Sequence, residues 1–184
     1  VQLVVALLVL DLVQWCTHVA LHKVPFLWAF HRVHHSVRDM DWAGAFRFHF
    51  VEIIVYRATA WLPLALFGFD AGVLFALAVV GTVHGHFNHA NVDVSIGKLA
   101  YVFNSPRMHL WHHHDEPNLP PVNFGVVLSV WDWLAGTARL PERPPSRLGF
   151  EGVESFPASL PGQVLEPFVE AFYRRAAASR SSAD

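Results

Sequence analysis

Hydrophobic residues in this chain fall into long runs and not into the short alternations of a half-buried sheet. Residues 1–22 form an apolar run of about the length that spans the hydrocarbon core of a bilayer. A second run covers residues 46–67 and a third covers residues 71–90, with residues 68–70 between them. So short a connection predicts a helical hairpin. The pattern therefore predicts an all-α fold, an integral membrane bundle of helices.

The remainder of the chain changes character twice. Residues 104–120 are polar, whereas residues 122–134 are apolar but short for a span, so we expect them to lie against the bundle or at the membrane interface. The proline-rich residues 141–184 predict an accessory tail with one amphipathic helix over 163–178 and disorder in the last residues. The chain starts at Val1 without a charged leader region. We interpret the first run as a membrane helix of the mature protein and expect a truncated N-terminus.

Basic residues predict the orientation of the runs in the membrane. The connection at 68–70 carries none, whereas basic residues gather in two other segments. They include Lys23, Arg32, Arg38 and Arg47 between the first and second spans, and Arg107, Arg139, Arg143 and Arg147 after the third. Because positive residues collect on the cytoplasmic side, both segments are expected there. Arg32, Arg38 and Arg107 also form a candidate docking surface for an acidic electron carrier.

Composition narrows the function classes. The chain is 53% hydrophobic, and its 13 Lys and Arg balance its 15 Asp and Glu, so no basic stripe indicates nucleic-acid binding. The single cysteine, Cys16, excludes a disulfide framework, a Cys-ligated iron–sulfur cluster and a zinc ribbon within this chain. Thirteen histidines are roughly three times the ordinary usage. A metal in this chain is therefore expected to be held by histidine.

The spacing of the histidines carries the functional prediction. They form the groups His18-x3-His22, His31-x2-His34-His35, His84-x4-His89 and His109-x2-His112-His113. On a helix, residues i and i+4 share a face, so several imidazoles converge. Neutral imidazole binds iron, zinc and copper, and ten histidines are enough for two ions. A lone histidine in a membrane helix more often bonds a neighbouring helix than binds a metal. We expect the ungrouped His49, His86 and His114 to support the ligands or to lie at the surface.

Seven segments together resemble the membrane fatty acid hydroxylase superfamily, which includes sterol desaturases, fatty acid hydroxylases and alkylglycerol monooxygenases. They are DLVQWCTHVALH (11–22), LWAFHRVHHS (27–36), RFHFVE (47–52), HGHFNHANVD (84–93), SPRMHLWHHHDEP (105–117), NFG (123–125) and WDWLAGT (131–137). The resemblance covers about residues 8–140, and we take residues 1–140 as the catalytic domain. It implies a helical cap at the cytosolic ends of the membrane helices that carries a di-iron centre.

The resemblance also implies the chemistry. The centre would use O2 and two electrons to hydroxylate or desaturate a lipid, a sterol or fatty acyl chain among the candidates, and zinc can replace iron in purified protein. The implied ligands are His18, His22, His31, His34, His35, His89, His109, His112 and His113, with His84 less closely matched.

Electrons must come from another protein. The sequence carries no glycine-rich nucleotide fingerprint, P-loop or cysteine cluster, so a cytochrome b5-like protein, a ferredoxin or a flavin reductase is the implied partner. The competing interpretation is a histidine-rich metal-binding protein for transport or storage, or an inactive scaffold. A transporter places its ligands along a path near the midplane. The clusters here are expected at one end, which favours the oxygenase.

Two charges are predicted inside the membrane. Asp11 lies about 11 residues from the cytosolic end of the first run and Arg57 about 10 from that of the second, each about 15 Å deep at about 1.5 Å per residue. Because an unpaired charge is costly there, we predict an ion pair between them. The alternative is that Asp11 bonds neutral groups while Arg57 reaches towards the interface.

Other side chains are candidates to support the metal ligands. Glu52 is predicted near the level of His18, where it would orient the second ring nitrogen of a ligand, and the resemblance favours Asp132 for the same task. Asn91 is a candidate distant ligand or water anchor. The tryptophans are expected to form an interfacial belt. The alternative to a belt is that Trp111 and some of Phe46, Phe48 and Phe103 line a channel for the lipid.

Overall fold

The computed structural model describes residues 1–181, and over these residues the chain is helical and contains no β-strand, which confirms the all-α class. The α-helices are α1 (Gln2–Lys23), α2 (Pro25–His35), α3 (Phe50–Tyr56), α4 (Leu62–Leu66), α5 (Ala71–His89), α6 (Pro106–His112), α7 (Val130–Ala135) and α8 (Leu160–Ser181). Shorter helical turns are η1 (Trp42–Phe46), η2 (Arg57–Trp61), η3 (Gly97–Tyr101) and η4 (Val153–Ser155).

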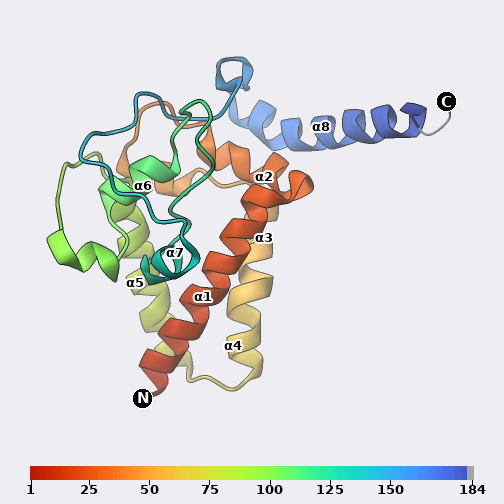
Figure 1. Cartoon of the computed structure of the whole chain (residues 1–184). Helices are drawn as coiled ribbons and strands as arrows, with labels where there is room; N and C mark the ends of the chain where they lie inside the picture. The colour runs from red at the N-terminus through yellow and green to blue at the C-terminus, as the bar shows by residue number, and fades with distance from the viewer. Residues whose placement is uncertain (182–184) are drawn as a thin grey trace.

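Helices α1 and α5 and the segment from α3 to α4 form the lower part of the molecule as drawn in Figure 1. In Figure 1, α1, α5 and the α3–η2–α4 segment run side by side, with the loop between α4 and α5 near the N-terminus. Their shared core includes Ala6, Leu10, Ala60 and Leu77, and the small alanines allow close approach of the backbones. Asp70 caps α5, because its carboxylate accepts hydrogen bonds from the amides of Gly72 and Val73. The predicted hairpin is confirmed.

The second apolar run is not one continuous α-helix. It divides into α3, the π-helical turn η2 and α4, and Pro63 lies at the start of α4. Proline removes one backbone donor and clashes with the preceding turn, and a π turn accommodates such a change of register. Two helices, α1 and α5, are each long and apolar enough to cross a membrane. Large apolar side chains such as Leu8, Phe75 and Val83 are exposed on their outer faces.

A cap of shorter helices lies across one end of this bundle. Figure 1 shows α2 and α6 at the end remote from the N-terminus. Proline occupies the first turn of both helices, where its fixed φ suits the helix and its missing N–H costs nothing. Ser105 completes the start of α6 by accepting a hydrogen bond from the amide of Met108. These signals place both HxxHH motifs on helices in the cap.

The residues after 140 pack on this cap. The helix predicted over 163–178 is present as α8 (Leu160–Ser181). Its first part lies against α2, where Glu166 and Glu170 pair with Arg32, and its remainder extends away from the bundle (Figure 1). His49 also donates a hydrogen bond to the carbonyl of Val164. The disorder expected for the last residues concerns 182–184, which lie outside the described residues.

Candidate metal centre

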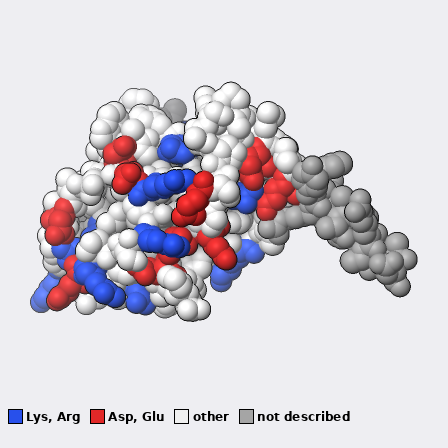
Figure 2. Space-filling model, turned by 90° about the horizontal axis from the view of Figure 1, so that it is seen from above, with Lys and Arg blue, Asp and Glu red and all other residues white. Residues whose placement is uncertain are grey.

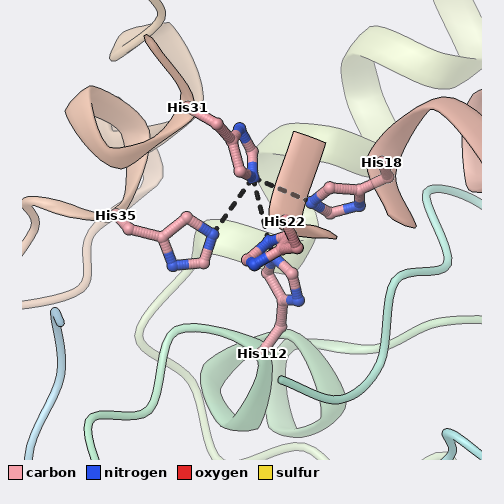
Figure 3. Close-up of side chains that lie close together, drawn as sticks. All are labelled: His18, His22, His31, His35 and His112. Carbon is pink, nitrogen blue, oxygen red and sulfur yellow. Dashed lines mark hydrogen bonds between the residues drawn. The ribbon is translucent and has the colours of Figure 1, made fainter. Parts of the chain in front are cut away.

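Nine histidines gather into two groups inside the cap. Each group brings one potential ligand atom per residue to within 4.8 Å of all the others. One group comprises His18, His22, His31, His35 and His112, and the other comprises His34, His89, His109 and His113. Figure 3 shows the five rings of the first group pointing to a common centre from α1, α2 and α6. His22 is partly exposed, and the other eight are buried.

Separations between the ring nitrogens match the shell of a metal ion. In the first group, Nε2 of His31 lies 3.1 Å from that of His18, 3.0 Å from that of His22 and 3.2 Å from that of His35 (Figure 3). In the second group, the Nε2 atoms of His89 and His109 are 3.0 Å apart. Two nitrogens about 2.1 Å from one ion and about 90° apart are separated by about 3.0 Å. Each group therefore fits one ion.

The opposite ring nitrogens show that these Nε2 atoms carry lone pairs. Nδ1 of His18 lies 2.7 Å from the carbonyl oxygen of Phe124, and Nδ1 of His112 lies 2.8 Å from that of Val122. Nδ1 of His34 is likewise 3.1 Å from the carbonyl of Arg47, and Nδ1 of His89 is 2.7 Å from the carbonyl of Gly85. A carbonyl only accepts, so each Nδ1 donates and each Nε2 is an acceptor. Acceptors that face one another repel unless a cation lies between them.

The HxxHH spacing divides each motif between the two groups. Successive residues of a helix turn by about 100°, so His31 and His35 share a face whereas His34 points elsewhere. His31 and His35 belong to the first group and His34 to the second. On α6 the assignment is reversed, because His109 and His113 belong to the second group and His112 to the first. The two sites are thus adjacent and share both helices.

Burial keeps the cap histidines neutral. The pKa values of His31, His34, His35, His109, His112 and His113 lie well below the ordinary value, chiefly because burial disfavours the charged ring and also because neighbouring histidines repel a second proton. Neutral imidazole is the form that binds a metal ion. Nδ1 of His109 and of His113 is buried with no hydrogen-bond partner among the described residues, so these two rings are oriented less firmly than the rest.

Glu52 lies in contact with one of these rings. Its Oε1 accepts a hydrogen bond of 2.7 Å from Nδ1 of His31, and both side chains are fully buried. The sequence placed this carboxylate near the level of His18, and the structure places it against His31. A carboxylate at Nδ1 orients the ring and increases the basicity of Nε2.

Asp132 acts one step further from the ligands. Its carboxylate accepts hydrogen bonds from the amides of Phe124 and Gly125, from the Trp15 indole and from the Thr137 hydroxyl. It contacts no histidine ring, and so the predicted direct contact is replaced by an indirect one. Asp132 fixes the loop whose Phe124 carbonyl orients His18. Gly125 is required in this loop, because a Cβ there would lie 2.4 Å from the carbonyl oxygen of Leu128.

The predicted ion pair between Asp11 and Arg57 is wrong. Asp11 accepts hydrogen bonds from the amides of Val127 and Leu128 and from the Trp131 indole. Arg57 lies over the Trp61 ring, with its guanidinium carbon 5.2 Å from the ring centroid. Three N–H donors already satisfy both oxygens of the carboxylate, and so it needs no arginine. Trp15 and Trp131 are accordingly specific donors to Asp132 and Asp11, a role that the prediction of an interfacial belt did not include.

Two other predicted site residues lie outside both groups. His84 precedes His89 by five residues, which places the two about 140° apart around α5, and the buried Nε2 of His84 has no partner among the described residues. Asn91 is exposed in the irregular segment after α5.

The three ungrouped histidines make local hydrogen bonds. His49 caps α3, His86 donates to the carbonyl of Trp42, and His114 accepts from the amide of Glu116. These three have local structural roles outside both groups.

A cavity of about 380 Å³ leads from the histidines into the bundle. Five of the nine grouped histidines line it: His18, His31, His34, His89 and His109. The rest of its lining is mainly apolar and comes chiefly from residues 45–48, the α3–η2 segment and α5, whereas α1 adds the polar Gln14. Phe46 and Phe48 line the cavity, as the channel interpretation expected, whereas Trp111 and Phe103 do not. Trp111 instead donates to the carbonyl of Arg143.

Small residues of α5 make room for this cavity. Ala78, Gly81 and Gly85 follow one another at helical spacing, and all three line it. A Cβ added at Gly81 or Gly85 would meet no atom within 4 Å. From Ala78 to His89 the helix rises about 16 Å at about 1.5 Å per residue. The cavity is therefore long enough for a segment of an extended lipid chain.

The polar surface does not carry the predicted basic docking site. Figure 2 shows acidic and basic side chains interspersed on the face seen from above. Arg32 pairs with Glu166 and Glu170, and Arg107 pairs with Asp93. Arg38 donates to the carbonyl of Val153. Because acids already neutralise two of the three arginines, this surface does not present a continuous positive charge to an acidic carrier.

The structure thus combines a helical bundle, a histidine-lined cap and an adjoining cavity that is mainly apolar. The profile of the fatty acid hydroxylase family matches residues 3–137, and the chain belongs to this family. The chain is 34% identical over 145 residues to the ornithine lipid hydroxylase OlsE of Rhizobium tropici, an alignment that covers 79% of this chain and 44% of that protein. It is 31% identical over 142 residues to the alkylglycerol monooxygenase of Homo sapiens, covering 72% of this chain and 29% of the relative.

The chain thus spans less than half the length of these curated relatives. No solved structure matches it.

Proposed function

We propose that this chain is a membrane-bound di-iron monooxygenase that hydroxylates a lipid with O2. The observation that carries the proposal is the convergence of nine imidazoles, five of them with Nδ1 turned to a backbone carbonyl or to Glu52, on two centres at the mouth of an apolar cavity. We further propose that α1 and α5 cross the membrane and that the cap lies on its cytoplasmic side, as the basic segments predict.

The donor set fits iron. Imidazole suits iron, zinc and copper, and a shell of five histidines beside one of four provides ligands for two ions. When bound, two iron ions would supply the redox chemistry by which one oxygen atom enters a C–H bond. The overall reaction is R–H + O2 + 2e⁻ + 2H⁺ → R–OH + H2O, and an external electron-transfer protein supplies the electrons.

The residues of the chain position the substrate and exclude water. Phe46, Phe48 and Ile53 provide apolar walls, and the small residues of α5 leave space between them. His18, His34 and His109 reach the same space. A lipid carbon held there lies beside the ligand shell and away from bulk solvent, and small changes in its position decide which bond reacts.

Metal transport or storage is less well supported by this arrangement. Transport would use ligands along a polar path, whereas both groups lie together at one end of the bundle. The space that adjoins them is lined mainly by apolar side chains, which suit a hydrocarbon chain and not a hydrated ion.

The proposal is tested by turnover with ¹⁸O2. Iron-loaded protein in lipid vesicles, supplied with a chemical or enzymatic reductant, is expected to convert a lipid into a monohydroxylated product that carries ¹⁸O, detected by mass spectrometry. Gly81→Leu fills the cavity without touching a ligand and should lower the product yield about ten-fold or more while the metal content stays the same. Val79→Leu, at an exposed position on the same helix, should leave the yield unchanged.

Iron-loaded protein that forms no oxygenated lipid in whole-lipid extracts would contradict the proposal. Equal activity in Gly81→Leu and the unaltered protein would remove the cavity from the mechanism.

A further inference from the structure

Arg57 is an arginine in the middle of an apolar segment without an acidic partner. It follows α3 and lies seven residues from the first residue of that helix and nine from the last residue of α4. Among residues 1–170, whose side chains the structure describes, no carboxylate or carbonyl accepts a hydrogen bond from it, and its described contact is the face of Trp61 at 5.2 Å. A charge in hydrocarbon is costly and usually marks a ligand or ion path.

The same arginine lines the cavity that reaches the histidines. Gln14 of α1 and Trp61 line it too, so a cation, an amide and an aromatic ring border one stretch of an otherwise largely apolar space. Arg57 follows Glu52 by five residues, about 7.5 Å along the axis at about 1.5 Å per residue. Glu52 contacts His31. Along the helix axis, Arg57 is therefore roughly two helical turns or less from the metal ligands.

The backbone at this point is also exceptional. The π turn η2 begins at Arg57 and ends at Trp61. It therefore sets the directions in which these two cavity-lining side chains leave the backbone. A π turn costs stability and is retained most often where it directs side chains for a function. The cation–π contact holds the guanidinium over the ring and leaves its N–H groups to other acceptors.

We propose that Arg57 binds an anionic oxygen group, a carboxylate or a phosphate, carried by the lipid in the cavity. The inference rests on the proposed function, because it takes the cavity as the substrate site. A planar guanidinium matches either group in bidentate fashion, and the pair is strengthened in a medium of low polarity. Because the arginine lies near the level of the ligands, the lipid carbon beside them is close to the polar group and not at the far end of the chain.

The test measures binding without turnover. Zinc-loaded protein, which has no redox activity, is titrated in detergent with hexadecanoate, hexadecyl phosphate and the neutral hexadecanol. The unaltered protein should bind at least one of the anions about ten-fold more tightly than the alcohol, and the preferred anion distinguishes carboxylate from phosphate. Arg57→Met should abolish this preference and leave hexadecanol binding unchanged. Arg57→Lys should keep part of it.

Elemental analysis checks that each variant retains its metal and therefore its fold. Ile54→Met changes an exposed position on α3 and should bind the three lipids like the unaltered protein. An anion preference that persists in Arg57→Met, or that is absent from the unaltered protein, would overturn the inference. Failure of the proposed function appears separately, as iron-loaded protein that binds lipid with this preference but forms no product.

Discussion

At the scale of single residues, the contacts at Nδ1 determine what the histidines do. A ring whose Nδ1 donates to a carbonyl presents a lone pair at Nε2, and this holds for His18, His34, His89 and His112. His31 differs, because its partner is the carboxylate of Glu52. Glu52 therefore places a carboxylate against the ring of His31, which makes Nε2 of this ligand more basic.

Replacing Glu52 should weaken metal binding without destroying the fold. Glu52→Leu keeps most of the volume, but removes the acceptor of His31, and should lower metal affinity about 10- to 100-fold in a competition titration with a chelator. Glu52→Gln keeps an acceptor without the charge, so its metal affinity should lie between that of Glu52→Leu and that of the unaltered protein. Glu151→Gln alters an exposed carboxylate and serves as the control. Unchanged metal affinity in Glu52→Leu would show that the hydrogen bond from His31 to Glu52 does not support metal binding.

Asp11 and Arg57 should respond differently to neutralisation. Asp11→Asn places an amide among three N–H donors and should lower the free energy of unfolding by about 1–3 kcal/mol, measured by thermal denaturation in detergent. Arg57→Met removes a charge that has no acidic partner and should leave stability unchanged or higher. Equal losses in both variants would instead favour an ion pair between them.

At the scale of elements, the loop at 122–129 links the membrane helices to the metal sites. Asp11 of α1 holds one end of this loop, at Val127 and Leu128, and Asp132 of α7 holds Phe124 and Gly125. Two carbonyls of the same loop orient His18 and His112. Both of these histidines belong to the five-histidine group.

Asp132→Asn should therefore affect the two metal sites unequally. Loosening the loop should release the metal of the five-histidine group first, so elemental analysis after dialysis should fall from two metals per chain towards one. Asp93→Asn changes an exposed carboxylate paired with Arg107 and should retain both. Parallel loss of both metals in Asp132→Asn would mean that the loop supports the whole cap and not one site.

The sequence predicted the elements that depend on local signals. Apolar length gave α1 and α5, and the i, i+4 spacing gave the convergence of the histidines. It failed where a partner comes from far along the chain. Asp11 bonds residues more than a hundred positions away, and no periodicity reports such a contact. The π turn was missed too, because Pro63 marks a disturbance but not its form.

At the scale of the whole molecule, a cap of shorter helices lies across one end of the helical bundle (Figure 1), and both histidine groups lie inside this cap. The chain after 140 belongs to this arrangement, since α8 packs on α2 and the amide of Gly149 donates to the carbonyl of His113. A cavity lined by five of these histidines extends between α3 and α5 of the bundle. The proposed function requires that the cap hold two metal ions.

Metal content per chain tests that claim most directly. Protein expressed with added iron and purified in detergent is analysed for iron and zinc beside His112→Ala and His84→Ala. We predict two metals per chain in the unaltered protein, about one or fewer in His112→Ala, and two in His84→Ala, because His84 lies outside both groups. Metal near zero in the unaltered protein, or equal losses in the two variants, would contradict the account.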